Sequence, residues 1–188
     1  MTGRRSSDQT RAAILRAARE RFAAQGYERT TIRTVAADAE IDPSMVMRYF
    51  GSKEQLFDAA LAVDLRLPDL GSVPAGELPA VLVRHFVERW EGEPADDALL
   101  VLLRSAVTNE QAAARMREVF AAQVAPALAA ALGPERAART AGLVATQLLG
   151  LALTRYLLRL PAVTSLTPDE LVAGLSPALS ATLNPPRG

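Results

Sequence analysis

One stretch near the N-terminus carries guanidinium, ammonium and hydroxyl side chains whose spacing suits contact with a polyanion. A guanidinium can pair in two ways with the O6 and N7 atoms of guanine, so Arg33 and Arg48 are candidates for reading a base. Thr31, Tyr49 and Lys53, the only lysine of the chain, suit contacts with phosphate oxygens, although Tyr49 could instead be a packing residue. The other residues predicted to contact a duplex are Thr34, Pro43, Ser44, Met45 and Met47.

A short helix is predicted around the first of these side chains. Apolar residues recur on one helical face at i, i+3, i+4 and i+7, and either Thr30 or Thr31 can cap the N-terminus of the helix. Glu40 and Ile41 form the turn after it. The apolar face consists of Ile32, Val35, Ala36 and Ala39.

A second helix is predicted from Pro43 to Tyr49, because Asp42 can cap it and a proline at its first position needs no N–H. Val46 and Phe50 are expected to face inward, and Gly51 ends the helix. A helix this short is not stable alone in water and must be braced by a neighbour. Two helices braced across a turn are typical of a helix-turn-helix, in which the second helix enters a DNA groove.

Further helices are expected on both sides of this pair. Ser52 can cap the helix that follows, with Gln55 as its capping-box partner. Ahead of the pair, a longer helix is predicted from Asp8 to Gln25, ending at Gly26. The inward faces of the two helices consist of Leu56, Phe57, Ala60 and Leu61, and of Ile14, Leu15, Ala18 and Phe22.

Positive charge is concentrated at the same end of a chain whose net charge is zero. Residues 1–33 hold eight arginines and three carboxylates, an excess of five positive charges. This excess favours phosphate binding, although exposed helices commonly carry charge without any such function.

The pattern from Phe22 to Phe57 resembles the TetR family of transcriptional repressors. The resemblance implies a three-helix DNA-binding domain, a helical C-terminal domain for ligand binding and dimerisation, and two-fold recognition of DNA. The matching residues are Gly26-Tyr27, Thr30-Thr31-Ile32-Arg33, Val35-Ala36, Ala39, Ile41 and Tyr49-Phe50-Gly51-Ser52-Lys53-Glu54-Gln55-Leu56-Phe57.

Three residues depart from that family's pattern. Glu40 occupies a turn position where glycine is usual, and a positive φ there would cost stability. Asp42 replaces the usual serine or threonine, so its carboxylate would repel phosphate or accept from a cytosine amino group. Met47 stands where a tyrosine often touches phosphate; a thioether cannot donate that bond, but it can contact a thymine methyl group.

Composition narrows the class of protein. The 188 residues are 49% apolar and almost lack strand signals, so the expected fold class is all-α. The absence of cysteine excludes disulfides and thiolate catalysis. We also find no glycine-rich phosphate loop, no Ser-His-acid order and no metal-ligand cluster, so neither an enzyme nor a cofactor is expected. A pure dimerisation scaffold with a vestigial DNA helix stays as an alternative.

The longest apolar run, 141–158, contains charged and polar residues, which favours a bundle helix over a membrane span. No signal peptide is visible, so a cytoplasmic protein without membrane contact is expected. We predict a DNA-binding domain at 1–52, a linking helix at 53–66 and an effector and dimer domain at 67–188. The helices predicted in the last domain span residues 80–90, 96–108, 110–132 with a kink at Pro126, 134–160, and 168–183 after an N-cap at Thr167.

The helix over 141–160 is apolar on more than one face, which indicates packing against its own domain and against a second copy. With the last helix it would form a homodimer interface, and the small residues Gly142, Gly150 and Ala152 would permit close approach. The alternative is the central helix of a monomeric bundle. A two-fold dimer would place its recognition helices about 34–36 Å apart on a near-palindromic operator.

The family resemblance also implies a small-molecule effector that releases the repressor from DNA. Aromatic, methionine and a few polar side chains in the C-terminal helices suit an apolar or amphipathic ligand, although each could be ordinary core. Arg104 and Arg155 could each bind an anionic ligand, pair with an acid or reach solvent. The candidates are Phe86, Trp90, Leu103, Arg104, Met116, Phe120, Gln147, Arg155 and Tyr156.

Overall fold

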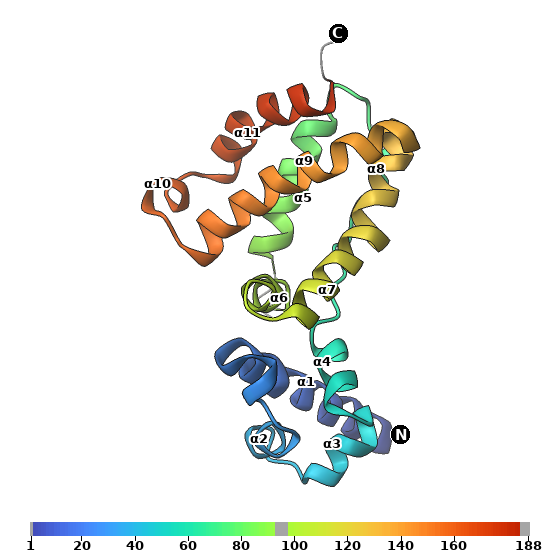
Figure 1. Ribbon diagram of the computed structural model, residues 1–188, viewed down its shortest axis with the longest axis vertical. Coiled ribbons are helices and arrows are strands. Elements are labelled where there is room, and N and C mark those ends of the chain that lie inside the picture. The colour runs from blue at the N-terminus through green and yellow to red at the C-terminus, as the bar shows by residue number, and fades with distance from the viewer. Residues whose placement is uncertain (1, 93–97, 185–188) are drawn as a thin grey trace. The chain divides into compact units, whose positions relative to one another are not determined.

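The computed structural model describes residues 2–92 and 98–184, and the regular elements in this part of the chain are all helical (Figure 1). The all-α fold class is therefore confirmed. The described residues form two compact units, an N-terminal unit of 2–63 with 98–117 and a C-terminal unit of 64–92 with 118–184.

The N-terminal unit contains α1 (Thr2–Arg29), α2 (Ile32–Asp38), α3 (Pro43–Phe50), α4 (Lys53–Ala60), α6 (Ala98–Ala106) and most of α7 (Glu110–Val119). The C-terminal unit contains η1 (Leu70–Ser72), α5 (Leu78–Glu91), the π-turn η3 (Phe120–Val124), α8 (Ala125–Leu132), α9 (Pro134–Ala152), the π-turn η4 (Leu153–Leu157), α10 (Pro161–Thr164) and α11 (Pro168–Leu183).

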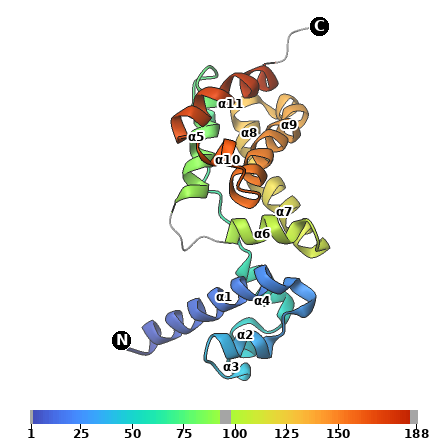
Figure 2. The ribbon, with the colours of Figure 1, turned by 90° about the vertical axis from the view of Figure 1, so that its left-hand side faces the viewer.

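Helix α1 is the central support of the N-terminal unit, because α2, α4 and α6 all pack against it. Helices α2 and α3 lie side by side on one side of α1 (Figures 1 and 2). Most residues of the predicted apolar faces are buried here, although Ile32 and Ala39 of the α2 face are only half-buried. The periodicity of the sequence thus identified most of the core. The side chains that fill it include Ile14, Ala18, Phe22, Val35, Ala36, Val46, Phe50, Leu56, Phe57, Ala60 and Leu61.

Two helix ends differ from prediction. Helix α1 continues past Gly26 to Arg29, after a kink where glycine adopts φ 74° and ψ 176°. Helix α4 ends at Ala60, although we predicted a linking helix to residue 66. Beyond this end the chain is not helical: the Leu65 N–H donates to the Gln123 side chain at 2.8 Å, and Arg66 adopts φ 50°, outside the right-handed helical region.

In the C-terminal unit, α5 packs on α11, and α9 packs on both α8 and α11. The predicted kink at Pro126 takes the form of a π-turn, in which the Ala125 N–H donates to the Phe120 carbonyl. This wider turn accommodates a proline that cannot continue the hydrogen-bond ladder. The predicted cap of the last helix is also present, as Thr167 and Glu170 form a reciprocal capping box. The predicted helix start at Asp96 lies outside the described residues.

Within residues 2–92 and 98–184, no helix combines the length and apolar character that a bilayer crossing requires.

Candidate functional site

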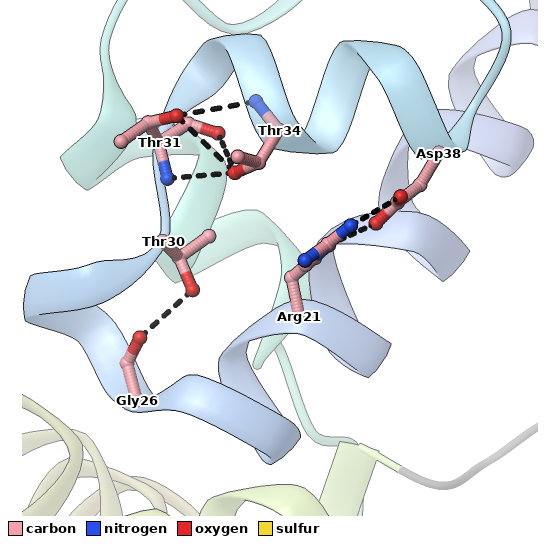
Figure 3. A network of polar contacts seen from close by, with 6 residues as sticks. All are labelled: Arg21, Gly26, Thr30, Thr31, Thr34 and Asp38. Carbon is pink, nitrogen blue, oxygen red and sulfur yellow. Dashed lines mark hydrogen bonds and ion pairs between the residues drawn. The ribbon is translucent and has the colours of Figure 1, made fainter.

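Helix α2 is fixed at its N-terminus by three threonines (Figure 3). Thr31 is the N-cap: its hydroxyl accepts from the Thr34 N–H at 3.1 Å, and the Thr34 hydroxyl accepts from the Thr31 N–H at 3.0 Å. Thr30 is fully buried and its hydroxyl donates to the Gly26 carbonyl at 2.8 Å. The choice between two possible caps is thus decided by burial, since Thr30 is turned inward to secure the kink of α1.

An ion pair joins the far end of α2 to α1 (Figure 3). Arg21 donates to both carboxylate oxygens of Asp38, one of them at 2.6 Å. These hydrogen bonds hold the pKa of Asp38 below its ordinary value. Two other α1 arginines also contact the protein: Arg19 donates to the Ala60 carbonyl at 2.8 Å, and Arg11 lies 5.4 Å from the centre of the Phe50 ring. Some of the arginines that make up the excess positive charge therefore stabilise contacts between the helices.

The turn between α2 and α3 has the conformation that makes glycine usual at this position. Glu40 adopts φ 55°, in the left-handed region that an L-residue with a Cβ rarely occupies. The Ile41 N–H donates to the Ala36 carbonyl at 2.9 Å and closes the turn. The backbone at Glu40 therefore has the conformation for which we predicted a loss of stability.

Helix α3 is capped by Asp42 as predicted, with one carboxylate oxygen accepting from the Ser44 N–H at 2.8 Å. The Ser44 hydroxyl donates to the same oxygen. The two bonds lower the pKa of Asp42, hydroxyl first and backbone second, so the carboxylate is charged at neutral pH. Because the exposed Ser44 hydroxyl already donates its proton to Asp42, it is left with acceptor capacity only.

The predicted contact residues of α2 and α3 divide into exposed and half-buried sets. Val46 and Phe50 are buried as expected, so they support α3 from inside. Met47 on the opposite side is 45% exposed. The exposed candidates are Thr31, Arg33, Pro43, Ser44, Met47 and Arg48, and the half-buried ones are Thr34, Met45, Tyr49 and Lys53.

Three residues of α1 contact predicted phosphate-binding side chains, and none of them had a predicted part in these contacts. The hydroxyl of Ser7 lies 3.0 Å from that of Tyr49. The Lys53 ammonium lies 4.1 Å from the centre of the Tyr27 ring and donates to the Glu28 carbonyl at 3.4 Å. Tyr27 belongs to the motif that carries the family resemblance, but spacing alone does not reveal which side chain its ring meets.

Four effector candidates of the C-terminal unit come together at the ends of α5 and η4. The Trp90 and Tyr156 rings are stacked, with centroids 4.9 Å apart and an interplanar angle of 4°. Phe86 lies 5.7 Å from Trp90. Arg155 donates to Glu91 at 2.8 Å and to the carbonyl groups of α10 and the residues after it. Of the three alternatives predicted for Arg155, the structure contains the pairing with an acid.

Glu91 also accepts from the Tyr156 hydroxyl at 3.2 Å. Burial first, and the neighbouring carboxylate second, raise the pKa of Tyr156 above its ordinary value, so the phenol is neutral. Gln147 is held elsewhere, with its amide donating to the Thr182 hydroxyl at 2.6 Å, while its carbonyl oxygen is buried without a hydrogen-bond partner among the described residues. Phe120 packs against the core of the C-terminal unit, whereas Leu103, Arg104 and Met116 belong to the N-terminal unit.

Comparison with known proteins agrees with this geometry. Residues 14–60 match the family model described as bacterial regulatory proteins of the tetR family, and residues 76–183 match that of the tetracyclin repressor-like C-terminal domain. The second match alone covers more than half of the chain.

Among characterised proteins, an HTH-type transcriptional repressor from Mycobacterium tuberculosis is 36% identical over 88 residues, 47% of this chain and 44% of that protein. The regulator TcmR from Streptomyces glaucescens is 37% identical over 101 residues, 48% of this chain and 44% of that protein. The similarity thus spans less than half the length of these relatives.

Among solved structures, a TetR-family regulator from Streptomyces coelicolor superposes with a TM-score of 0.66 and 29% identity, over 94% of this chain and 95% of the other. Salmonella enterica GusR superposes with a TM-score of 0.67 over 93% and 95%, and at 19% identity it supports the fold alone. From the helix-turn-helix, the two family matches and these superpositions, the chain belongs to the TetR family of bacterial regulatory proteins.

Proposed function

We propose that this chain is a ligand-responsive transcriptional regulator, a repressor that binds a near-palindromic operator as a homodimer and is released by a small apolar or amphipathic effector. DNA binding is assigned to residues 1–52, and effector binding and dimerisation to residues 67–188. One observation carries the proposal: α3 buries Val46 and Phe50 while Met47 and Arg48 stay exposed on a helix braced by its neighbours. This is the arrangement that a recognition helix needs to enter a major groove.

The outward surface of α9 and α11 supports the homodimer. Leu143 and Leu149 on α9 are 58% and 37% exposed, and Leu153 at the start of η4 is 38% exposed, which is unusual for leucines in a helical bundle. Ala152, which was also expected on this surface, is buried. A Cβ built at Gly142 or Gly150 would meet nothing within 4 Å, so the helix surface there is open to close approach. After the first turn of the neighbouring α11, the exposed residues are small or short: Ala173, Gly174, Pro177, Ala178 and Ala181.

The stacked aromatic rings near the end of α5 support an effector that is planar or apolar. An effector of this kind would act by favouring a dimer state whose recognition helices no longer match the groove spacing.

A gel-shift titration tests the DNA-binding part directly. The probe is the duplex upstream of the protein's own gene, and the competitor is a duplex of equal length and shuffled sequence. We expect a shift that resists the competitor and weakens steeply as salt rises, because phosphate contacts release counterions. A protein that shifts no duplex even at low salt would instead be a dimerisation scaffold, and the proposal would fail.

A further inference from the structure

Lys53, the first residue of α4, is held in place by aromatic and backbone groups at the end of α1. Its ammonium nitrogen lies 4.1 Å from the centre of the Tyr27 ring, within the range of a cation–π contact. The same nitrogen donates to the Glu28 carbonyl at 3.4 Å. An ammonium group has three N–H donors, so this arrangement leaves donors for a further acceptor.

The Tyr27 ring is itself fixed on two sides. Its centroid lies 4.9 Å from that of Phe57, edge to face at 79°, and 6.1 Å from that of Phe22, nearly parallel at 11°. Phe22 and Phe57 are almost completely buried. The kink at Gly26 redirects the backbone immediately before Tyr27, and Thr30 secures that kink by donating to the Gly26 carbonyl. The ring is therefore a rigid platform.

We propose that Tyr27 is a positioning residue for DNA binding, whose ring holds the Lys53 ammonium where it meets a phosphate of the duplex. The inference rests on the proposed DNA-binding function and on Lys53 as a phosphate contact. A lysine side chain is flexible and strongly hydrated, so ordering it before the duplex arrives reduces the cost in conformational entropy on binding. Packing alone would need only an apolar side chain at position 27.

A double-mutant cycle separates positioning from packing. The variants are Tyr27→Leu, which removes the ring, Tyr27→Phe as the matched control that keeps it, Lys53→Gln, and the combination of Tyr27→Leu with Lys53→Gln. Each is titrated with one mixed-sequence 30-base-pair duplex over a range of salt concentrations, after circular dichroism has shown that it is folded.

We expect Tyr27→Leu to weaken binding about two- to fivefold, the ratio that corresponds to an exposed cation–π contact. Lys53→Gln should make the binding less dependent on salt: the magnitude of the slope of log K against log salt should fall by about one for each phosphate that the protein no longer neutralises. In the Lys53→Gln background, Tyr27→Leu should have no further effect, and Tyr27→Phe should bind like the wild type. Equal losses of affinity from Tyr27→Leu with and without Lys53 would overturn the inference. Wild-type protein that binds no duplex would refute the proposed function instead.

Because Lys53 is the only lysine, its side-chain protons can be followed by NMR in the unsubstituted protein. A position over the Tyr27 ring should shift the Hε resonances upfield, and the shift should persist when the same 30-base-pair duplex is added. Movement of these resonances to unshifted positions in the complex would mean that Lys53 leaves the ring to bind DNA, and the inference would be wrong. This measurement tests whether the Tyr27 ring holds Lys53 in the complex even if Tyr27→Leu does not fold.

Discussion

The hydroxyl of Ser7 on α1 lies 3.0 Å from the hydroxyl of Tyr49 on α3, and the two residues are 42 positions apart in the chain. The contact ties the first turns of α1 to the C-terminal half of the recognition helix. If Ser7 donates, the Tyr49 proton is free to reach a phosphate oxygen, so one contact can both orient the phenol and leave its donor available.

We therefore expect Tyr49→Phe to weaken binding to every duplex by about the same factor, since a phosphate contact carries no sequence information. Ser7→Ala should have a smaller effect, because it leaves the phenolic donor in place and removes one hydrogen bond worth about 0.5–1.5 kcal/mol. Gel-shift titrations on specific and shuffled duplexes measure both. Weakening confined to one sequence would mean that Tyr49 contacts a base, and no weakening at all would make it a packing residue.

Replacing Glu40 with glycine should stabilise the N-terminal unit. The left-handed conformation at this residue costs about 1–2 kcal/mol with a Cβ present, and glycine returns part of the gain through its greater freedom in the unfolded chain. We expect a net gain of about 0.5–1 kcal/mol in the free energy of unfolding, measured with urea. The control is Ala37→Gly at an exposed position in the last turn of α2, which should destabilise the unit by up to about 1 kcal/mol. A destabilised Glu40→Gly would show that the glutamate side chain contributes a contact.

The sequence predicted the helix-turn-helix well because its signals are local. The Asp42-Pro43 start, the apolar face of α2 and the Ser52 cap each act within one or two turns of helix, and the structure contains all three. The Ser52 cap is only half of the box expected, since the Ser52 N–H donates to the Phe50 carbonyl and not to Gln55.

What the sequence did not predict depends on residues distant in the chain. The non-helical segment after α4 is held by a hydrogen bond between residues 58 positions apart. The ion pair of Arg21 depends on where Asp38 lies after folding. From the composition, Arg21 could be recognised only as one positive charge among several. For the same reason, Arg155 could not be assigned to Glu91 before the fold of the C-terminal unit was known.

Replacing Arg33 or Arg48 should weaken binding mainly to the specific duplex, whereas replacing Tyr49 should weaken binding to every duplex. Both side chains are exposed, Arg33 on α2 and Arg48 on α3. If each pairs with a guanine edge, its replacement by alanine should cost about 1–3 kcal/mol at the selected operator and much less on shuffled DNA. Selection of bound duplexes from a random pool, followed by titration, measures both quantities. Equal weakening on all DNA would make that arginine a phosphate contact.

The ion pair between Arg21 and Asp38 should make the stability of the N-terminal unit depend on pH in the acid range. The pKa of Asp38 is lowered in the folded state, chiefly by the hydrogen bonds from Arg21. Its contribution is therefore present above the ordinary carboxyl pKa of about 3.9 and is lost as pH falls through the lower folded value. Urea unfolding from pH 7 to pH 2 should show the difference between wild type and Asp38→Asn shrinking below about pH 4. Asp58→Asn, which removes the same charge from an exposed position on α4, should show no comparable trend.

Leu143→Arg should separate the proposed homodimer into single subunits. This leucine is 58% exposed on the outward face of α9, next to Gly142, where the helix surface is open. In a two-fold interface the substitution places two arginines close together, and burying them without partners is strongly unfavourable. We expect sedimentation equilibrium to change from twice 20.1 kDa to 20.1 kDa. Val107→Arg is the matched control, because Val107 is 73% exposed and lies outside α9 and α11.

The same variant tests whether dimerisation and DNA recognition depend on each other. A single subunit can contact only one half-site, so Leu143→Arg should lose most of its preference for a palindromic duplex over a duplex with one half-site. It should keep the salt-dependent binding that a single recognition helix supports. If Leu143→Arg stayed dimeric and Val107→Arg did not, the interface would lie in the N-terminal unit, and α9 and α11 would have to be covered by something other than a second copy.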